Sequence, residues 1–158
     1  MSTTGHIDMD AKKTSASIRI AAPPSVIFEL LADPRQHHTF DGSGMVTGLI
    51  SGPERLTRGD KFAMNMKIGP LPYRISSKVV EHDEDKLIAW QHMGKHRWRY
   101  ELEEIEDGTL VTETFDWSTA VLPPAIEAVG YPKRHLTSIE QTLARLKEIA
   151  EKRSLENQ

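Results

Sequence analysis

The chain contains no cysteine, which excludes disulfide bonds, thiolate catalysis and zinc sites with cysteine ligands. It contains no apolar run near the roughly 18 residues needed to cross a bilayer, so we expect no membrane insertion. Its 20 Lys and Arg are outnumbered by 23 Asp and Glu, giving a net charge of −3, and we expect no nucleic-acid partner. Residues 1–13 lack the apolar core of a signal peptide, which favours a cytoplasmic location.

The 158 residues are enough for one domain with a hydrophobic core, and they show no internal repeat or linker. Residues 1–13 are polar and aperiodic, so we expect a disordered tail there. We expect a single domain over residues 14–153 and a short polar tail over residues 154–158.

Residues 17–34, SIRIAAPPSVIFELLADP, predict a strand, a sharp turn and a short helix with defined ends. Polar and apolar residues alternate up to Ile20, as in a half-buried strand. Pro23 and Pro24 end that strand, and proline is tolerated in the first turn of the helix that follows. The helix stops at Asp33, because a residue before proline disfavours the helical conformation.

The rest of the chain predicts a run of hairpin-linked strands and then one long helix. Helices that are segregated from consecutive antiparallel strands are typical of the α+β class, here with about seven strands. The apolar stripe of the long helix can cover the buried face of such a sheet. The expected strands are 14–20, 45–50, 61–68, 73–81, 87–93, 97–105 and 109–117, and the long helix begins at residue 131.

The segment Ile18–Pro34, the hairpin at Asp107–Gly108–Thr109 and the closing helix together resemble the polyketide cyclase/dehydrase branch of the START-like, birch-allergen-like superfamily (SRPBCC). The resemblance covers residues 14–153. It implies the helix-grip fold: a curved antiparallel sheet around a long C-terminal helix, two short helices after the first strand, and a hydrophobic cavity inside. The superfamily includes lipid carriers, cyclases and chaperone activators, so the fold alone does not choose a function.

Aromatic residues and histidine recur on two of the expected strands. A turn at residues 94–96 would place Trp90 opposite Tyr100 and His92 opposite Trp98, all on one face. A two-residue turn would slip the register and turn Trp90 and His92 outward. We favour the first register because it separates apolar from charged side chains. The shared face then either lines a pocket or packs as plain core, since both use the same residue types.

Glu113 shares its strand parity with Val111, Phe115 and Trp117, which predicts that it points inward. An inward carboxylate has a raised pKa unless it is paired, and it can act as an acid, a base or a ligand anchor. The alternative is that Glu113 pairs with a neighbouring side chain or that a bulge turns it to solvent.

Three other polar residues, His37, His38 and Asp41, follow the first helix, and His135 lies in the closing helix. Their spacing matches no recognisable set of metal ligands, so we expect solvated surface positions and neither a metal nor a cofactor.

The sequence favours binding or transport of a hydrophobic or aromatic small molecule, such as a lipid, a polyketide or a related metabolite. One alternative is a cyclase- or dehydratase-type enzyme in which His92 and Glu113, the candidate catalytic residues, move protons. Another is a protein-interaction module that uses the outer sheet face around Arg97 and Arg99. The predicted ligand-binding residues are Phe62, Met64, Met66, Tyr73, Ile75, Trp90, His92, Trp98, Tyr100, Glu113, Phe115, Trp117, Tyr131, His135 and Ile139.

Overall fold

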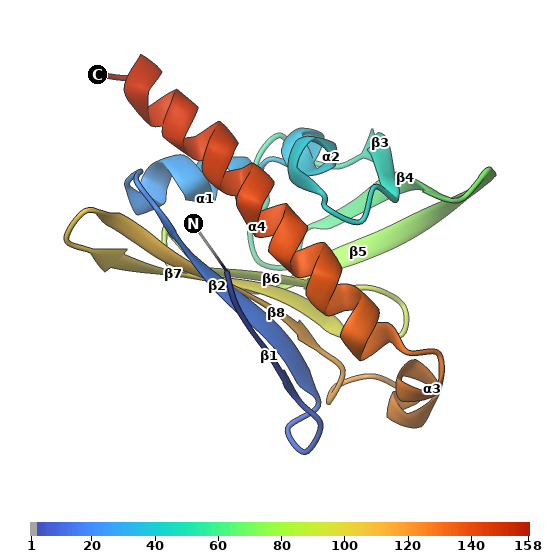
Figure 1. Cartoon of the computed structure of the whole chain (residues 1–158). Helices are drawn as coiled ribbons and strands as arrows, with labels where there is room; N and C mark the ends of the chain where they lie inside the picture. Colours follow the sequence, from blue (N-terminus) through green and yellow to red (C-terminus); the bar gives the residue numbers. More distant parts are fainter. Residues whose placement is uncertain (1–2) are drawn as a thin grey trace.

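A computed structural model describes residues 3–158. It has two layers, a mixed-length antiparallel sheet of eight strands and the long helix α4, Tyr131–Glu156, which runs across one face of the sheet (Figure 1). The strand order is β1-β2-β8-β7-β6-β5-β4-β3. This arrangement confirms the predicted α+β class and the helix-grip-like architecture.

The bounds of the strands and short helices follow the sequence pattern closely. The strands are β1 (Thr4–Asp8), β2 (Lys13–Ile20), β3 (Val46–Ser51), β4 (Lys61–Ile68), β5 (Leu71–Asp83), β6 (Leu87–Gln91), β7 (Arg97–Ile105) and β8 (Gly108–Asp116). The short helices are α1 (Pro24–Ala32), the 3-10 turn η1 (Pro34–Gln36), α2 (His37–Phe40) and α3 (Pro123–Ala128).

Residues 1–13 were predicted to be a disordered tail, but residues 4–8 of this segment form strand β1. Residues 1–2 of the predicted tail lie outside the described range. Strand β1 pairs antiparallel with β2 along its whole length, so the sheet has one strand more than expected. Its sequence, TGHID, has no apolar alternation, because an edge strand with little burial needs none. At the other end of the chain, α4 extends through part of the predicted polar tail to Glu156.

The predicted register between β6 and β7 was wrong by two residues. Trp90 pairs with Trp98, and Ile88 pairs with Tyr100. The connection is a five-residue loop, residues 92–96, because Lys95 N donates to His92 O (3.0 Å) and ends the ladder earlier than expected. A shift of two residues preserves strand parity, so each side chain stays on the face that the sequence predicted.

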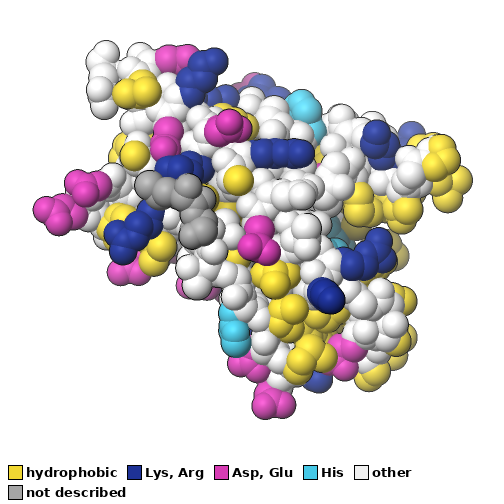
Figure 2. Space-filling view, in the orientation of Figure 1, with side chains coloured by type: hydrophobic (Ala, Val, Ile, Leu, Met, Phe, Trp, Pro, Cys, Tyr) yellow, Lys and Arg dark blue, Asp and Glu magenta, His cyan; other side chains and the backbone are white. Residues whose placement is uncertain are grey.

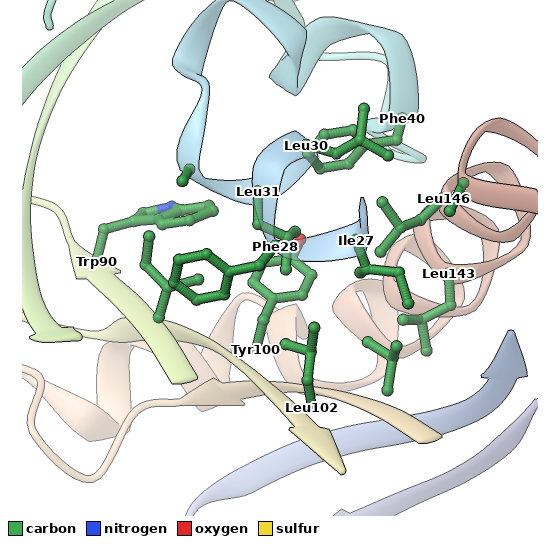
Figure 3. Close-up of a cluster of buried hydrophobic side chains, with 14 of the residues drawn as sticks. Ile27, Phe28, Leu30, Leu31, Phe40, Trp90, Tyr100, Leu102, Leu143 and Leu146 are labelled. Atoms are coloured by element: carbon green, nitrogen blue, oxygen red, sulfur yellow. The ribbon is translucent and has the colours of Figure 1, made fainter. Parts of the chain in front are cut away.

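The core lies between the sheet and the helices. The buried stripe of α4 is Ile139, Leu143, Leu146 and Ala150, while its solvent face is polar (Figures 1 and 2). Figure 3 shows α1 wedged between α4 and the sheet, with Ile27 directed toward α4 and Phe28 close to the strands. Burial of these apolar faces fixes α4 on the sheet. The inner face of the sheet toward the β6–β7 loop is less apolar and forms a separate region.

Candidate functional site

The inner face of β6, β7 and β8 changes character along its length. At one end it holds only apolar side chains, such as Ile88 and Leu102, which are buried. Toward the β6–β7 loop it becomes polar and aromatic, and the side chains there are less buried: Tyr100 is buried, whereas Trp98 and His92 are partly exposed. This gradient identifies the polar aromatic region as the candidate site and the loop end as its open side.

Glu113 is the deepest ionisable group of this region, with 3% of its surface exposed. The Tyr100 hydroxyl donates to Glu113 Oε2 (2.9 Å), while Oε1 has no hydrogen-bond partner. Burial raises the pKa of Glu113 well above its usual range; the Tyr100 hydrogen bond opposes this rise and the negative charge of Asp41 adds to it. The environment therefore favours the protonated acid, which has a hydrogen to donate.

His37 was expected at the solvated surface, but it is buried and lies over the inner end of the site. Its ring stacks on Trp90 at 4.7 Å and meets Phe62 edge-on at 5.5 Å. Nε2 donates to the carbonyl of Leu31 (2.8 Å), which fixes the neutral tautomer. Desolvation by burial lowers the pKa of His37 to about 4.

Three further histidines gather at the open side. His92 is hydrogen-bonded through Nδ1 to Ser77 Oγ (2.7 Å) and contacts the His96 ring at 5.3 Å. His135, from the first turns of α4, packs on Phe115 at 4.4 Å. Burial, followed by the neighbouring histidines, lowers the pKa of His92 to about 3, and burial foremost lowers that of His135 to about 4. These rings are therefore neutral at pH 7.

The two candidate catalytic residues do not meet. His92 follows β6 and Glu113 lies on β8, with β7 between them, and Glu113 is level with Ile88, four residues before His92. Two strand spacings and this offset separate their backbones by roughly 16 Å. The structure instead pairs His92 with Ser77, and Glu113 with Tyr100. With a pKa of about 3, His92 is too weak a base to abstract a proton efficiently at neutral pH, and burial favours the protonated form of Glu113.

The charge of the site is near zero. Within the described residues no Lys or Arg side chain is buried. The same part of the chain contains no group of three or more His, Asp or Glu placed to hold a metal ion. Hydrogen bonding and apolar contact are therefore the interactions that this region offers.

Most of the predicted ligand-binding residues lie on the inner face, but in two groups rather than one. Trp90, Phe62, Tyr100 and Glu113 form the inner group around His37. The outer group contains His92, Trp98, Phe115, Tyr131 and His135. Of the others, Met64, Trp117 and Ile139 are core residues, and Met66, Tyr73 and Ile75 are partly buried.

Four residues of the site were not predicted to belong to it. His96 is two residues before Trp98 and so shares its strand face, but the predicted turn at residues 94–96 placed His96 outside the strand. His37 and Asp41 belong to a segment too short to show a buried face. Gly42 gave no signal: its N–H donates to Thr142 Oγ1 (2.7 Å), and a Cβ there would lie 2.5 Å from Ser138 O and Thr142 N, so only glycine lets this loop approach α4.

Two hollows of the structure lie elsewhere. One, of about 470 Å³, is on the outer sheet face between Glu81, Arg99 and Thr112. The other lies beside Pro23, at the turn before α1. Neither is lined by a predicted ligand-binding residue. The inner site is instead filled by its own aromatic rings, so a guest there requires some of them to move.

The open side is covered by α3, none of whose residues is buried. Trp117 Nε1 donates to Glu127 Oε1 (3.0 Å), and Lys12 also reaches that oxygen (3.3 Å). Gly130 joins α3 to α4 with φ of +75°, a conformation that favours glycine. The cover is thus held by these polar contacts and by the partly buried Ile126, which packs against the core.

Comparisons with known proteins agree with this architecture. Residues 11–151 match the model of a family described as polyketide cyclase / dehydrase and lipid transport. Rv0088 of Mycobacterium tuberculosis, called an uncharacterized protein, is 40% identical over 151 residues, which are 92% of this chain and 67% of that protein.

Solved structures share the fold at low sequence identity. Ms6760 of Mycobacterium smegmatis superposes with a TM-score of 0.68 at 18% identity, over 94% of this chain and 99% of that one. A polyketide-cyclase-like protein, Cgl2372 of Corynebacterium glutamicum, gives a TM-score of 0.59 at 19% identity, over 92% and 94% of the two chains.

Proposed function

The chain belongs to the polyketide cyclase/dehydrase and lipid transport family, and we propose that it binds and carries an uncharged hydrophobic molecule with a carbonyl or hydroxyl group. Lipids, polyketides and related metabolites of this kind fit the inner face between the sheet and α4. Apolar burial supplies most of the affinity, and the polar end of the ligand is oriented by Glu113, which Tyr100 holds in place.

The observation that carries this proposal is the unpartnered Oε1 of Glu113. A buried polar atom without a partner is costly, and a group that completes its hydrogen bonding is favoured there. Tyr100 occupies the other oxygen, so the protonated acid has one direction left in which to donate. A ligand carbonyl or hydroxyl oxygen satisfies it.

The described residues include no buried Lys or Arg, and this favours ligands with an uncharged polar end. A carboxylate ligand would lose its hydration without meeting a buried cation in the described residues, and it would approach the negative charge of Asp41. A ketone, phenol or alcohol makes the same hydrogen bond without that cost. The site therefore favours such molecules over fatty acids of equal length.

Entry of the ligand follows the exposure gradient. The rings that must move, Trp98 and His135, lie at the open side and are partly exposed. The cover, α3, has no buried residue and is joined to α4 through Gly130. We therefore place the entrance between α3 and the β6–β7 loop.

An enzyme remains the second candidate, because a buried neutral acid can protonate a ligand carbonyl as well as bind it. In that case Glu113 is the acid of a cyclase or dehydratase reaction, and His92 orients rather than abstracts. Catalysis of this kind predicts loss of turnover in Glu113→Gln, whereas a carrier keeps binding because the amide still donates a hydrogen bond.

The test is ligand binding followed by native mass spectrometry and by the rise in melting temperature. A long-chain methyl ketone, the alcohol and the carboxylic acid of the same length are compared, together with an aromatic polyketide. We expect the ketone and the alcohol to bind at least as tightly as any acid. Glu113→Leu should weaken their binding about three- to tenfold, the equivalent of one hydrogen bond, and Glu113→Gln should restore it.

Glu101→Leu is the matched control, because Glu101 is exposed on the outer face of the neighbouring strand β7. Its binding should equal that of the unchanged chain. Tighter binding of the carboxylic acid than of the ketone and the alcohol contradicts the proposal. The absence of saturable binding by all four molecules also contradicts it and favours a packed interior.

A further inference from the structure

Large hydrophobic side chains are exposed mainly at one end of the molecule, around the proposed entrance. They come from the β4–β5 hairpin, the β6–β7 loop and the segment that contains α3. Seven of the ten such side chains in the described residues lie here: Ile68, Leu71, Met93, Val121, Leu122, Val129 and Tyr131.

Direct contacts join most of these segments into one surface. Val121 N donates to Gly94 O (2.9 Å), and Thr119 Oγ1 donates to Lys95 O (2.6 Å), so the β6–β7 loop and the chain before α3 are bonded together. Figure 1 shows the β4–β5 hairpin, the β6–β7 loop and α3 at the same end of the molecule. In Figure 2 hydrophobic side chains gather over this end, with Lys and Arg among them.

Charge on the molecule is divided along the same axis. Five exposed cations accompany the apolar side chains, from the β4–β5 hairpin, the β6–β7 loop and the first turn of α4: Lys67, Arg74, Lys95, Lys133 and Arg134. Acidic residues gather at the opposite end, in the β5–β6 turn (83–85) and around the β7–β8 turn (103–107).

The acidic residues near the apolar end do not cancel this pattern. Glu127 is paired with Lys12 (3.3 Å), which joins α3 to the β1–β2 turn. Asp8 ends β1 and Asp10 lies in that turn, at the margin of the surface. A net charge of −3 for the whole chain thus conceals one basic, apolar end.

We propose that this end, with its exposed apolar side chains ringed by lysine and arginine, docks on the surface of an anionic lipid bilayer. Apolar side chains enter the boundary between headgroups and acyl chains, and the cations approach the lipid phosphates. No helix of the described chain is long and apolar enough to span a bilayer, so the contact is with the surface. The opposite, acidic end is repelled by the same lipids and sets the orientation.

Docking in this orientation places the entrance against the lipid. Trp98 and His135 are partly exposed there and contact each other. The exposed apolar side chains on either side of the cover α3 enter the contact: Val121, Leu122 and Val129. That the bilayer supplies or receives the ligand rests on the proposed function, whereas the docking itself rests only on the exposed residues.

The experiment is co-sedimentation of the full chain with vesicles of phosphatidylcholine alone or with about one third phosphatidylglycerol. We expect binding to the anionic vesicles that weakens with added salt. Leu122→Asp should reduce the bound fraction about tenfold, and so should Lys133→Glu combined with Arg134→Glu.

Leu155→Asp is the matched control for the apolar change, because Leu155 is 70% exposed and Leu122 67%, but Leu155 lies at the far end of α4. Lys152→Glu is the control for the charge change at the same far end. Leu71→Asp, on the β4–β5 hairpin, gives a second apolar variant if Leu122→Asp fails to fold.

Equal binding of the variants and controls, or no preference for the anionic vesicles, overturns the proposal. Self-association abolished by Leu122→Asp, measured by light scattering in the absence of vesicle binding, also overturns it and identifies a second copy as the occupant. The ligand assay in solution separates the two hypotheses, since Leu122→Asp should leave ketone binding unchanged even where docking is lost.

Discussion

Replacing His37 by phenylalanine should make the stability of the protein less sensitive to acid. His37 is 5% exposed, and burial lowers its pKa from the ordinary 6.5 to about 4. At pH 5 the unfolded chain therefore binds a proton at this position and the folded chain does not. Stability is retained above pH 6.5 and is lost progressively as the pH falls toward 4.

The size of this loss follows from the two pKa values. Each pH unit between them costs up to about 1.4 kcal/mol, so the complete loss is about 3 kcal/mol. Between pH 7 and pH 5 the same relation gives about 2 kcal/mol, because the titration is incomplete at both limits. His37→Phe keeps the stacking on Trp90 and removes the titrating group, so this share of the acid sensitivity should disappear.

Urea unfolding at pH 7 and pH 5 measures the effect as the difference between the two free energies of unfolding. The comparison within each variant removes whatever the substitution costs at pH 7. His6→Gln, an exposed change on β1, is the control and should keep the full difference. The reasoning is refuted if His37→Phe loses as much stability on acidification as the unchanged chain does.

Three other substitutions test the packing around the site. Glu113→Leu should gain stability relative to the unchanged chain as the pH rises above about 4.3, because the folded state holds a proton that the unfolded state releases; unfolding curves from pH 5 to 8 measure this. Gly42→Ala should cost about 1–3 kcal/mol by steric overlap with α4, against less than about 0.5 kcal/mol for Gly48→Ala, where the added methyl meets open space; thermal melts compare them. Trp117→Phe should speed hydrogen exchange in α3 by removing the bond to Glu127, and unchanged exchange would contradict the weak anchoring of that helix.

The sequence predicted the faces of the strands better than their pairing. Parity alone placed Glu113, Phe115 and Trp117 inside, and all three are buried. The β6–β7 register depends on where the ladder ends. The turn closed by Lys95 N and His92 O ends it, and the same loop is bonded to a distant segment through Val121 N and Gly94 O. The alternation of residues within two strands does not predict a contact with a residue that is distant in sequence.

Two parts of the structure lay beyond sequence patterns for different reasons. Strand β1 is stabilised by backbone pairing with β2 and by contact of Gly5 with Leu136 of α4, neither of which requires an apolar period. His37 is buried because its ring packs on Phe62 of β4 and Trp90 of β6, both distant in sequence. Its burial is a tertiary effect, and a histidine beside an exposed histidine gives no hint of it.

One physical cause, burial away from water, moves the acid and the bases of this site in opposite directions. It raises the pKa of Glu113 and lowers those of His37, His92 and His135, so that every one of these groups is driven toward its neutral form. A site built for proton abstraction at pH 7 needs a base poised near that pH, and none of these three histidines is so placed. Chemistry that begins with donation from Glu113 would slow on the alkaline side as that acid ionises. Binding of an uncharged ligand requires no such step, and for this reason the carrier hypothesis follows more directly from the electrostatics than the enzyme does.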